Sequence, residues 1–172
     1  MRGENSLGDR RFRSAGRCVP VLATAFTACA PVPDPGAGLG LAESLALIDQ
    51  AEVSEIAPGQ VAETFALGTR ATDVQRDALQ ARLIGRSVEW EILVYEISLE
   101  GGWYEVASQP IPINDPNAVP LVRVWARVLP KGDQDETILQ SVKTGDSIKV
   151  RGIVQEIRLR TIVAIVPATL AY

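Results

Sequence analysis

The feature that most constrains this chain is a change in the spacing of its apolar residues at about Arg86. From there to the C-terminus, apolar and polar residues alternate with period two, which is the pattern of half-buried β-strands. A short helical run at 135–142 interrupts this pattern once. The alternation predicts five strands, at residues 87–99, 103–109, 121–129, 147–158 and 161–171.

Two or three short helices are predicted ahead of these strands. Residues 41–49 place apolar side chains on one helical face, and residues 59–67 lie between a proline and a glycine, which are typical of a helix start and end. The clearest helix opens at Thr72, where a threonine and a glutamine three residues later have the spacing of a capping box. It is expected to run through Leu83 and to end at Gly85, which can adopt the left-handed cap conformation.

The order of these elements predicts the fold class. A long first strand, a hairpin, a third strand, a short helix and a final hairpin is the order of an OB-fold. Closure of the sheet would also remove the edges that such apolar strands expose. We therefore expect a mainly β protein: a five-stranded OB-fold Greek-key barrel preceded by two or three short α-helices. Its inner face would carry Val122, Val124, Ala126 and Val128.

Several short phrases accompany this pattern. Residues 83–90 read LIGRSVEW, residues 144–146 read TGD ahead of IKVRG, and FALG and VQR occur upstream. With these phrases, the chain over about residues 60–172 resembles the bacterial exported OB-fold proteins grouped as tRNA-anti-like. The resemblance implies an OB-type barrel in a small secreted or membrane-associated protein, and it brings no settled activity and no functional residue. Nucleic-acid binding does not follow from the family name, because a fold does not determine a function.

The N-terminal residues predict export. Residues 1–17 carry five arginines and residues 18–28 carry no charge, as in a signal peptide, and this apolar run is too short to cross a bilayer. Cys29 follows Phe26-Thr27-Ala28, which resembles the lipobox of bacterial lipoproteins, so we expect lipidation of Cys29 and anchoring at the periplasmic or outer face of a membrane. The alternative is cleavage at the Ala28-Cys29-Ala30 triplet, which would release a soluble secreted or periplasmic protein.

These predictions divide the chain into four parts. Residues 1–28 form the signal peptide, and residues 29–40 form a disordered tether that is rich in proline and glycine. Residues 41–85 form a short helical segment that packs on the barrel, and residues 86–172 form the barrel itself.

Composition excludes several kinds of chemistry. The chain has no histidine, which rules out His-containing triads and other sites that need this side chain as a base or ligand. It also lacks a Gly-rich phosphate loop and a nucleophile-elbow motif. We therefore predict no enzymatic activity and no cofactor or metal, although Ser, Lys and carboxylates alone serve some hydrolases. With 17 basic and 21 acidic residues, the balance also argues against nucleic acid as a partner.

The sharpest candidate surface lies on the third predicted strand. Period-two spacing puts Arg123, Trp125 and Arg127 on the face opposite the valines. A tryptophan between two guanidinium groups can stack on a base or a sugar ring while the arginines hold a phosphate or a carboxylate. The alternative is that Trp125 lies under the N-terminal helices and that the arginines pair with local carboxylates such as that of Glu105.

Arg158 and Arg160 place further positive charge at the last hairpin. They would either extend the Trp125 surface or form a solvated edge that discourages pairing between sheets. Four other aromatic residues lie in apolar strand contexts, and we expect them in the core: Trp90, Tyr95, Trp103 and Tyr104.

The functional prediction is a non-catalytic binding module of the cell envelope. It would be a lipoprotein that recognises a peptide, a glycan or a protein partner, and that contacts the membrane through its N-terminal lipid. Two alternatives stay open. One is a structural or assembly lipoprotein that acts through its helical segment, and the other is an OB-fold that binds single-stranded nucleic acid.

Overall fold

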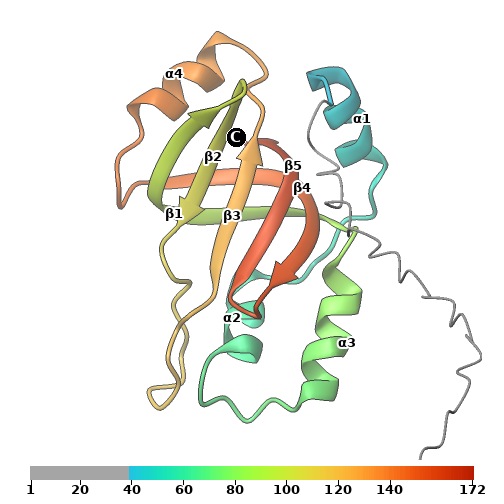
Figure 1. Cartoon of the computed structure of the whole chain (residues 1–172), viewed down its shortest axis with the longest axis vertical. Coiled ribbons are helices and arrows are strands. Elements are labelled where there is room, and N and C mark those ends of the chain that lie inside the picture. The colour runs from blue at the N-terminus through green and yellow to red at the C-terminus, as the bar shows by residue number, and fades with distance from the viewer. Residues whose placement is uncertain (1–38) are drawn as a thin grey trace, which may run out of the picture. The chain divides into compact units, whose positions relative to one another are not determined.

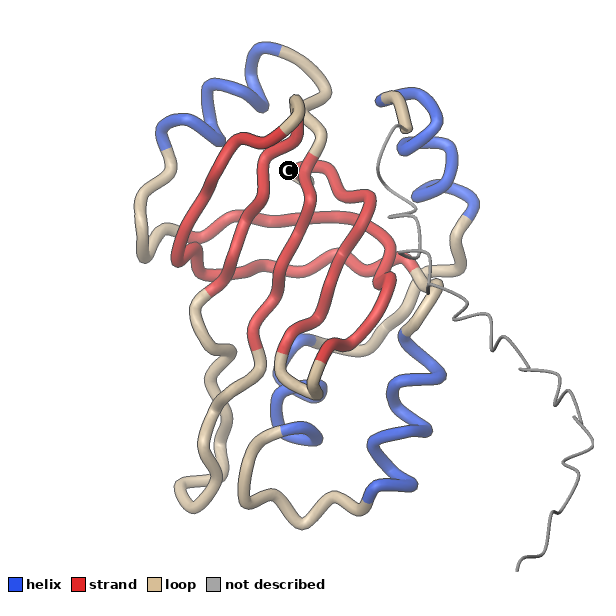
Figure 2. Tube along the Cα trace, in the orientation of Figure 1, coloured by secondary structure: helices blue, strands red, loops and turns tan. Residues whose placement is uncertain are grey.

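The structure is a computed structural model that describes residues 39–172. The predicted signal peptide, Cys29 and most of the predicted tether lie outside the described residues. The described part contains four helices and five strands, whose arrangement is drawn in Figures 1 and 2. Their bounds are α1 (Leu41–Gln50), α2 (Pro58–Phe65), α3 (Asp73–Leu83), β1 (Ser87–Glu100), β2 (Trp103–Ser108), β3 (Arg123–Val128), α4 (Asp133–Ser141), β4 (Ser147–Arg158) and β5 (Ile162–Leu170).

The predicted elements all form, with ends that differ from the expected ones by a few residues at most. α3 begins as its capping box predicts, because the Thr72 hydroxyl accepts from the Gln75 amide and the Gln75 side chain accepts from the Thr72 amide. Gly85 follows the helix with a φ of 79°, in the left-handed region that a residue with a Cβ rarely adopts. The described part is therefore mainly β with a few short helices.

The five strands form one sheet that closes on itself in the order β1-β2-β3-β5-β4. All neighbouring pairs are antiparallel except β3 and β5, which are parallel. β1 makes closure possible because its two halves pair with different strands. Residues 87–93 pair with β4, whereas residues 94–100 pair with β2, and a register shift between Val94 and Glu96 separates the halves.

The inner face of the closed sheet forms the core. The four residues of the third strand region that were expected to face inward are all buried, at 1% exposure or less: Val122, Val124, Ala126 and Val128. Leu79, Leu83 and Phe65 of α3 and α2 join this core at one end of the sheet, and α4 lies at the other end, where it contributes Leu139 (Figure 1). Each fully buried aliphatic side chain of this kind contributes about 1.5–3 kcal/mol of transfer free energy.

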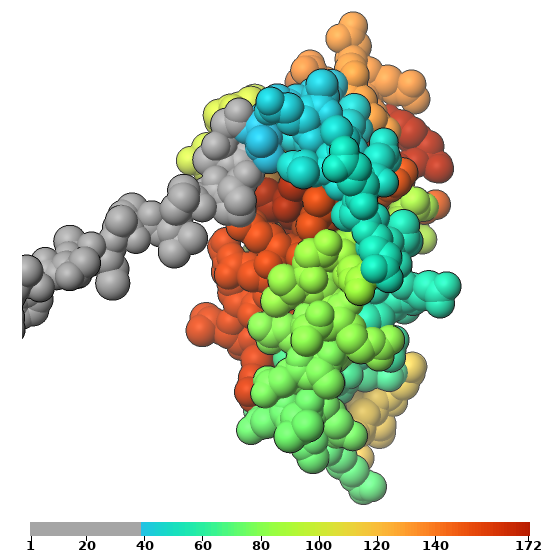
Figure 3. Space-filling view, turned by 90° about the vertical axis from the view of Figure 1, so that its right-hand side faces the viewer, coloured from blue at the N-terminus to red at the C-terminus, as the bar shows by residue number. Residues whose placement is uncertain are grey.

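Arginines just before β1, within β4 and in the last hairpin pair with carboxylates of the helical segment. Arg151 of β4 binds Asp49 at 3.0 Å, Arg160 binds Asp73 at 2.8 Å, and Arg86 pairs with Glu52. Figure 3 shows α1 and α3 on one side of the molecule, with atoms of the C-terminal strands between them. Three carboxylates of the helical segment are thus paired with arginines from residues 86–160.

Three of the four aromatic residues are buried as expected, and two of them, Trp90 and Tyr104, belong to the core of the closed sheet. Trp90, Trp103 and Tyr104 are buried, and the indole N–H of Trp90 donates to the Ile56 carbonyl at 2.9 Å. The expectation for Tyr95 is wrong, since its side chain is 51% exposed. Tyr95 lies within the register shift of β1, where one extra residue is inserted and the side chain is directed to the outside of the sheet.

Gly152 is expected to be essential for closure. It pairs with Val88 of β1 and with Ala168 of β5, and a Cβ at this position would lie 2.6 Å from Ile165 Cγ2, 2.8 Å from Ala168 Cα and closer still to the Pro167 carbonyl oxygen. Gly152→Ala should therefore lower the free energy of unfolding by about 1–3 kcal/mol or more, because backbone atoms must move. Chemical denaturation measures this loss.

Gly59→Ala is the matched control. Gly59 lies in α2, and a methyl group added there would have no neighbouring atom within 4 Å. Alanine should therefore leave stability unchanged or raise it by up to about 1 kcal/mol, through its higher helix propensity. Equal stability of the Gly152→Ala variant and the native chain would show that β4 and β5 do not need their close approach.

Candidate functional site

Arg123, Trp125 and Arg127 lie on the outer face of β3, opposite the buried valines. Arg123 is exposed, and the other two are half-buried. The strand register places Ala107 of β2 on one side of Trp125 and Ala164 of β5 on the other. Because both neighbours carry only a methyl group, neither can cover the indole ring.

Arg158 reaches the same ring from β4, across β5. Its guanidinium carbon lies 5.3 Å from the centre of the Trp125 ring, which is a cation–π distance. The same guanidinium group contacts the Glu156 carboxylate at 2.5 Å, so one residue of its own strand helps to hold it. The predicted extension of the surface towards the last hairpin is therefore present for Arg158.

The other two arginines of this face also lie over aromatic rings. The guanidinium carbon of Arg123 is 5.7 Å from the centre of the Tyr95 ring, and that of Arg127 is 5.8 Å from the centre of a Trp103 ring. Cations and rings thus alternate across the outside of the sheet. We call Arg123, Trp125, Arg127 and Arg158, together with Tyr95, the Trp125 face.

Arg160 does not join the Trp125 face. It lies in the turn between β4 and β5 with a φ of 59°, and its guanidinium group binds Asp73 at the start of α3 at 2.8 Å. The hydrogen bond from Arg160, followed by one from Arg76, lowers the pKa of the Asp73 carboxyl below its ordinary value. The role of Arg160 in the structure is to tie the last hairpin to a helix.

The alternative explanation of Trp125 is confirmed in one respect only. Arg127 does pair with Glu105, its partner in the register of β2 and β3, at 3.6 Å. Trp125, however, is not among the buried core residues, and Figure 1 shows no described helix in front of β3. Within residues 39–172, no carboxylate lies within ion-pair distance of Arg123, whose exposed guanidinium group lies over the Tyr95 ring.

The side chains of the Trp125 face can supply stacking contacts and hydrogen-bond donors. A flat, partly exposed ring beside guanidinium groups can stack on a planar or ring-shaped group while the N–H donors bind oxygen atoms.

Among residues 39–172, no cluster of three or more potential metal ligands is found. No helix in that part of the chain has both the length and the apolar character needed to cross a membrane.

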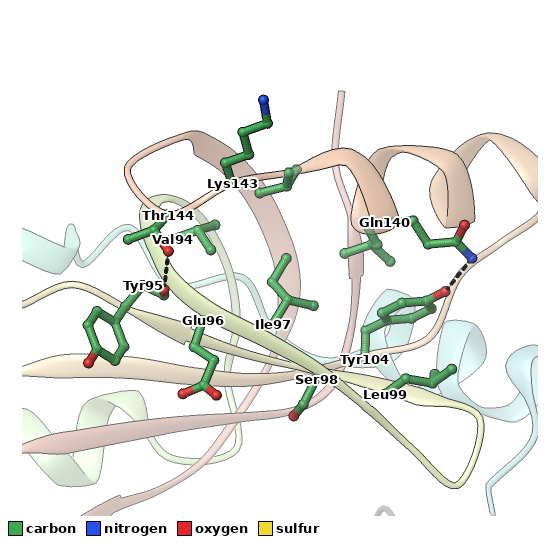
Figure 4. Close-up of a pocket in the computed structure, with 12 residues that line it drawn as sticks. Val94, Tyr95, Glu96, Ile97, Ser98, Leu99, Tyr104, Gln140, Lys143 and Thr144 are labelled. Carbon is green, nitrogen blue, oxygen red and sulfur yellow. Dashed lines mark hydrogen bonds between the residues drawn. The ribbon is translucent and has the colours of Figure 1, made fainter.

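A second surface was not foreseen from the sequence. A groove of about 610 Å³ runs between the second half of β1 and the C-terminal end of α4 (Figure 4). We call it the edge groove, and its lining comprises Val94, Tyr95, Glu96, Ile97, Ser98, Leu99, Tyr104, Leu139, Gln140, Val142, Lys143 and Thr144. No local pattern in the sequence marks it, because it depends on how far β4 pairs along β1.

Comparisons with protein-family models, with curated proteins and with solved structures found no match for this chain. The function of the Trp125 face and of the edge groove therefore has to be inferred from their geometry and chemistry.

The link between Arg160 and Asp73 gives a pH-dependent prediction. Because the pKa of Asp73 is lowered in the folded state, its carboxylate contributes to stability at pH values above its ordinary pKa of 3.8. This contribution is lost as the pH falls through the lower pKa of the folded state. Arg160→Ala should raise the pKa of Asp73 towards 3.8, because the largest cause of the shift is removed. A titration followed by NMR at the Asp73 side chain measures the change.

Arg82→Ala is the control on the same helix. Arg82 is exposed near the end of α3, and it is not among the groups that shift the pKa of Asp73. This variant should leave the Asp73 titration in place. An unchanged Asp73 pKa in Arg160→Ala would contradict the assignment of Arg160 to this contact.

Proposed function

We propose that this protein is a non-catalytic binding module of the bacterial cell envelope, which recognises a peptide, a glycan or a partner protein through the Trp125 face. The half-buried Trp125 ring, with Arg158 over it and alanines on both sides, is the observation that carries this proposal. A ring stacked on such a side chain contributes about 1–3 kcal/mol to binding.

The topology supports the proposal that the closed sheet is an OB-fold. The strand order, the parallel pair of β3 with β5 and the helix between β3 and β4 agree with that fold. OB-folds bind ligands on the face of their second and third strands and with the loops next to it. The Trp125 face is centred on β3, and Arg158 comes from the end of β4 beside the last hairpin.

The charges of the Trp125 face favour a ligand with few charges of its own. Arg127 and Arg158 each have a carboxylate close by, whereas no carboxylate of the described residues lies within ion-pair distance of Arg123. Sugar hydroxyl groups, peptide carbonyls and single carboxylates can accept from such a guanidinium group. A polyphosphate chain would require a larger excess of positive charge, so single-stranded nucleic acid is the weaker candidate.

The assembly alternative loses some of its basis in the helical segment. Asp49, Glu52 and Asp73 are paired with arginines elsewhere in the fold. These carboxylates are therefore less available to a partner protein. Among residues 39–172, no helix covers the outer face of β3 (Figure 1). For this reason we place the binding surface there.

Trp125→Ala should abolish binding while it leaves the melting temperature nearly unchanged, because the ring is outside the core. Probes for this experiment are soluble oligosaccharides such as chitotriose, short peptides and oligothymidine, and chemical shifts of the Ala107 and Ala164 amides report binding beside the ring. Trp90→Ala is the control for a core tryptophan. Trp90 is 3% exposed, and its loss should cost about 3–5 kcal/mol.

Two outcomes would contradict the proposal. Instability of Trp125→Ala comparable with that of Trp90→Ala would make Trp125 a structural residue. Binding of oligothymidine alone, with a steep fall of affinity as salt is added, would favour the nucleic-acid alternative.

The envelope location rests on the N-terminal sequence and has its own test. Intact mass measurement of the membrane fraction should find a chain that begins at Cys29 and carries a diacylglyceryl group. Cys29→Ser should shift the protein out of that fraction, because the thiol that takes the lipid is gone. An unmodified soluble chain cleaved within the Ala28-Cys29-Ala30 triplet would instead support the secreted alternative.

A further inference from the structure

The second half of β1 has a pairing partner on only one side. Its pairing with β4 ends at Leu93, and from Val94 to Glu100 it pairs with β2 alone. On the other side, the loop before β4 forms hydrogen bonds only with Val94 and Tyr95, at the beginning of this half. It uses the N–H and C=O of Val94, which bond to Asp146 and Gly145 at 2.8 Å each, and the Tyr95 carbonyl, which accepts from the Thr144 hydroxyl at 2.8 Å.

Beyond Tyr95, the outer side of the strand stays open. Within the described residues, no backbone hydrogen bond joins residues 96–100 to any segment other than β2. In an antiparallel pair, alternate residues direct their N–H and C=O groups away from the partner strand. Residues 96–100 therefore present a short row of main-chain donors and acceptors with no strand beside it.

The edge groove follows this open side of the strand. Six consecutive residues of β1, 94–99, line it. Successive side chains of a strand point to opposite faces, so a groove lined by six in a row runs along the edge of the strand and not over one face. The end of α4 and the loop after it form the facing wall (Figure 4).

Side chains along the edge sort into an apolar and a polar row. Ile97 points from β1 towards α4, and Leu99, which is 63% exposed, lies near it beside Tyr104 (Figure 4). Glu96 and Ser98 point to the opposite side of the strand. A strand added at this edge would therefore meet apolar groups on one of its faces and polar groups, including a carboxylate, on the other.

The charge around the edge groove is unbalanced. Among residues 39–172, no cation lies within ion-pair distance of Glu96, Glu100 or Glu136, the last of which is exposed on α4 one turn before Gln140. Lys143 is the cation of the lining, and its amino group points away from the strand (Figure 4). The groove therefore favours a ligand that carries positive charge.

We propose that the edge groove binds an extended segment of a partner protein, which adds to β1 as a further strand. The segment alternates apolar residues, which contact Ile97 and Leu99, with lysine or arginine residues, which pair with Glu96. This site goes beyond the Trp125 face and does not depend on it. The two surfaces meet at Tyr95, which lines the groove and lies under Arg123.

An extended peptide fits this edge better than other ligands do. A row of alternating main-chain donors and acceptors is complementary to another extended backbone, and neither a sugar nor a base presents such a row. A second copy of β1 would have the right backbone. It would, however, bring the carboxylates of two edges together, and like charges across a strand pair are destabilising.

The test uses the full chain and a fluorescein-labelled probe peptide, Lys-Val-Lys-Leu-Lys-Val-Lys. Binding is followed by fluorescence anisotropy. Two further peptides carry N-methyl groups on alternate amides, on one edge of the strand or on the other, with charge and side chains unchanged. Strand addition uses one edge of the peptide only, so one methylated peptide should bind about tenfold more weakly or worse, and the other should bind like the parent.

Leu99→Lys is the protein variant for this test, and Leu67→Lys is its matched control. Both leucines are 63% exposed. Leu67 comes two residues after α2, and α2 lies at the end of the sheet opposite α4 (Figure 1). Leu99→Lys should weaken probe binding about tenfold, since it removes an apolar contact and adds a repelling charge, whereas Leu67→Lys should not. Trp125→Ala should leave probe binding intact. The proposal for the edge groove can therefore be tested separately from the proposal for the Trp125 face.

Three results would overturn the proposal. Equal affinity of the two methylated peptides would mean that charge alone attracts the probe. Absence of probe binding would mean that the edge carboxylates serve to keep β1 unpaired. A dimer that forms in sedimentation experiments and is lost in Leu99→Lys would make a second copy of this chain the occupant.

Discussion

The structure depends on one long strand that pairs with two different neighbours. The first half of β1 bonds to β4 and the second half to β2, with an inserted residue where the strand changes partner. Without this change of partner, β1 would pair with β2 or with β4 alone, the sheet would stay open, and the valine face of β3 would be exposed to water. Burial of that face is the main source of stability, and the face is buried only when the sheet closes. Gly152 allows it, because β5 approaches the β4 backbone too closely for a side chain there.

Closure also decides where a ligand can bind. The inside of the sheet is filled by valine, isoleucine and leucine side chains, and helices cover both of its ends. What is left for recognition is the outer wall and any edge that closure does not use up. The Trp125 face lies on the outer face of the sheet. The edge groove lies along the second half of β1, beyond the residues that pair with β4. Both surfaces are therefore consequences of the way in which β1 is shared.

Tyr95 connects the two surfaces. Its side chain is directed outwards at the register shift, and its ring lies under the guanidinium group of Arg123. Its carbonyl group accepts a hydrogen bond from Thr144, in the loop that borders the edge groove. A peptide added at the edge would lie next to this ring. The module we propose could then hold one partner by its backbone while the neighbouring aromatic and guanidinium groups contact a second group.

Local patterns in the sequence determined the elements of this protein. Period-two alternation places the strands, the Thr72 capping box places the start of α3, and the valines of β3 mark the inner face, since each depends on residues a few positions apart. By the same spacing, Arg123, Trp125 and Arg127 had to share the outer face. A likeness in element order also pointed to a closed sheet, although order alone contains no information about register.

Only the tertiary structure decided which of these side chains meet. Arg158 lies over Trp125 because β5 and β4 follow β3 in a particular register, whereas Arg160, two residues further on, turns to Asp73 because the chain reverses there. The exposure of Tyr95 and the open edge of β1 depend on an inserted residue whose position is set by the pairing with β2 and β4. Such contacts join residues far apart in the chain, and the physical reason they escape sequence analysis is that register is selected by the packing of the whole closed sheet and not by any local preference.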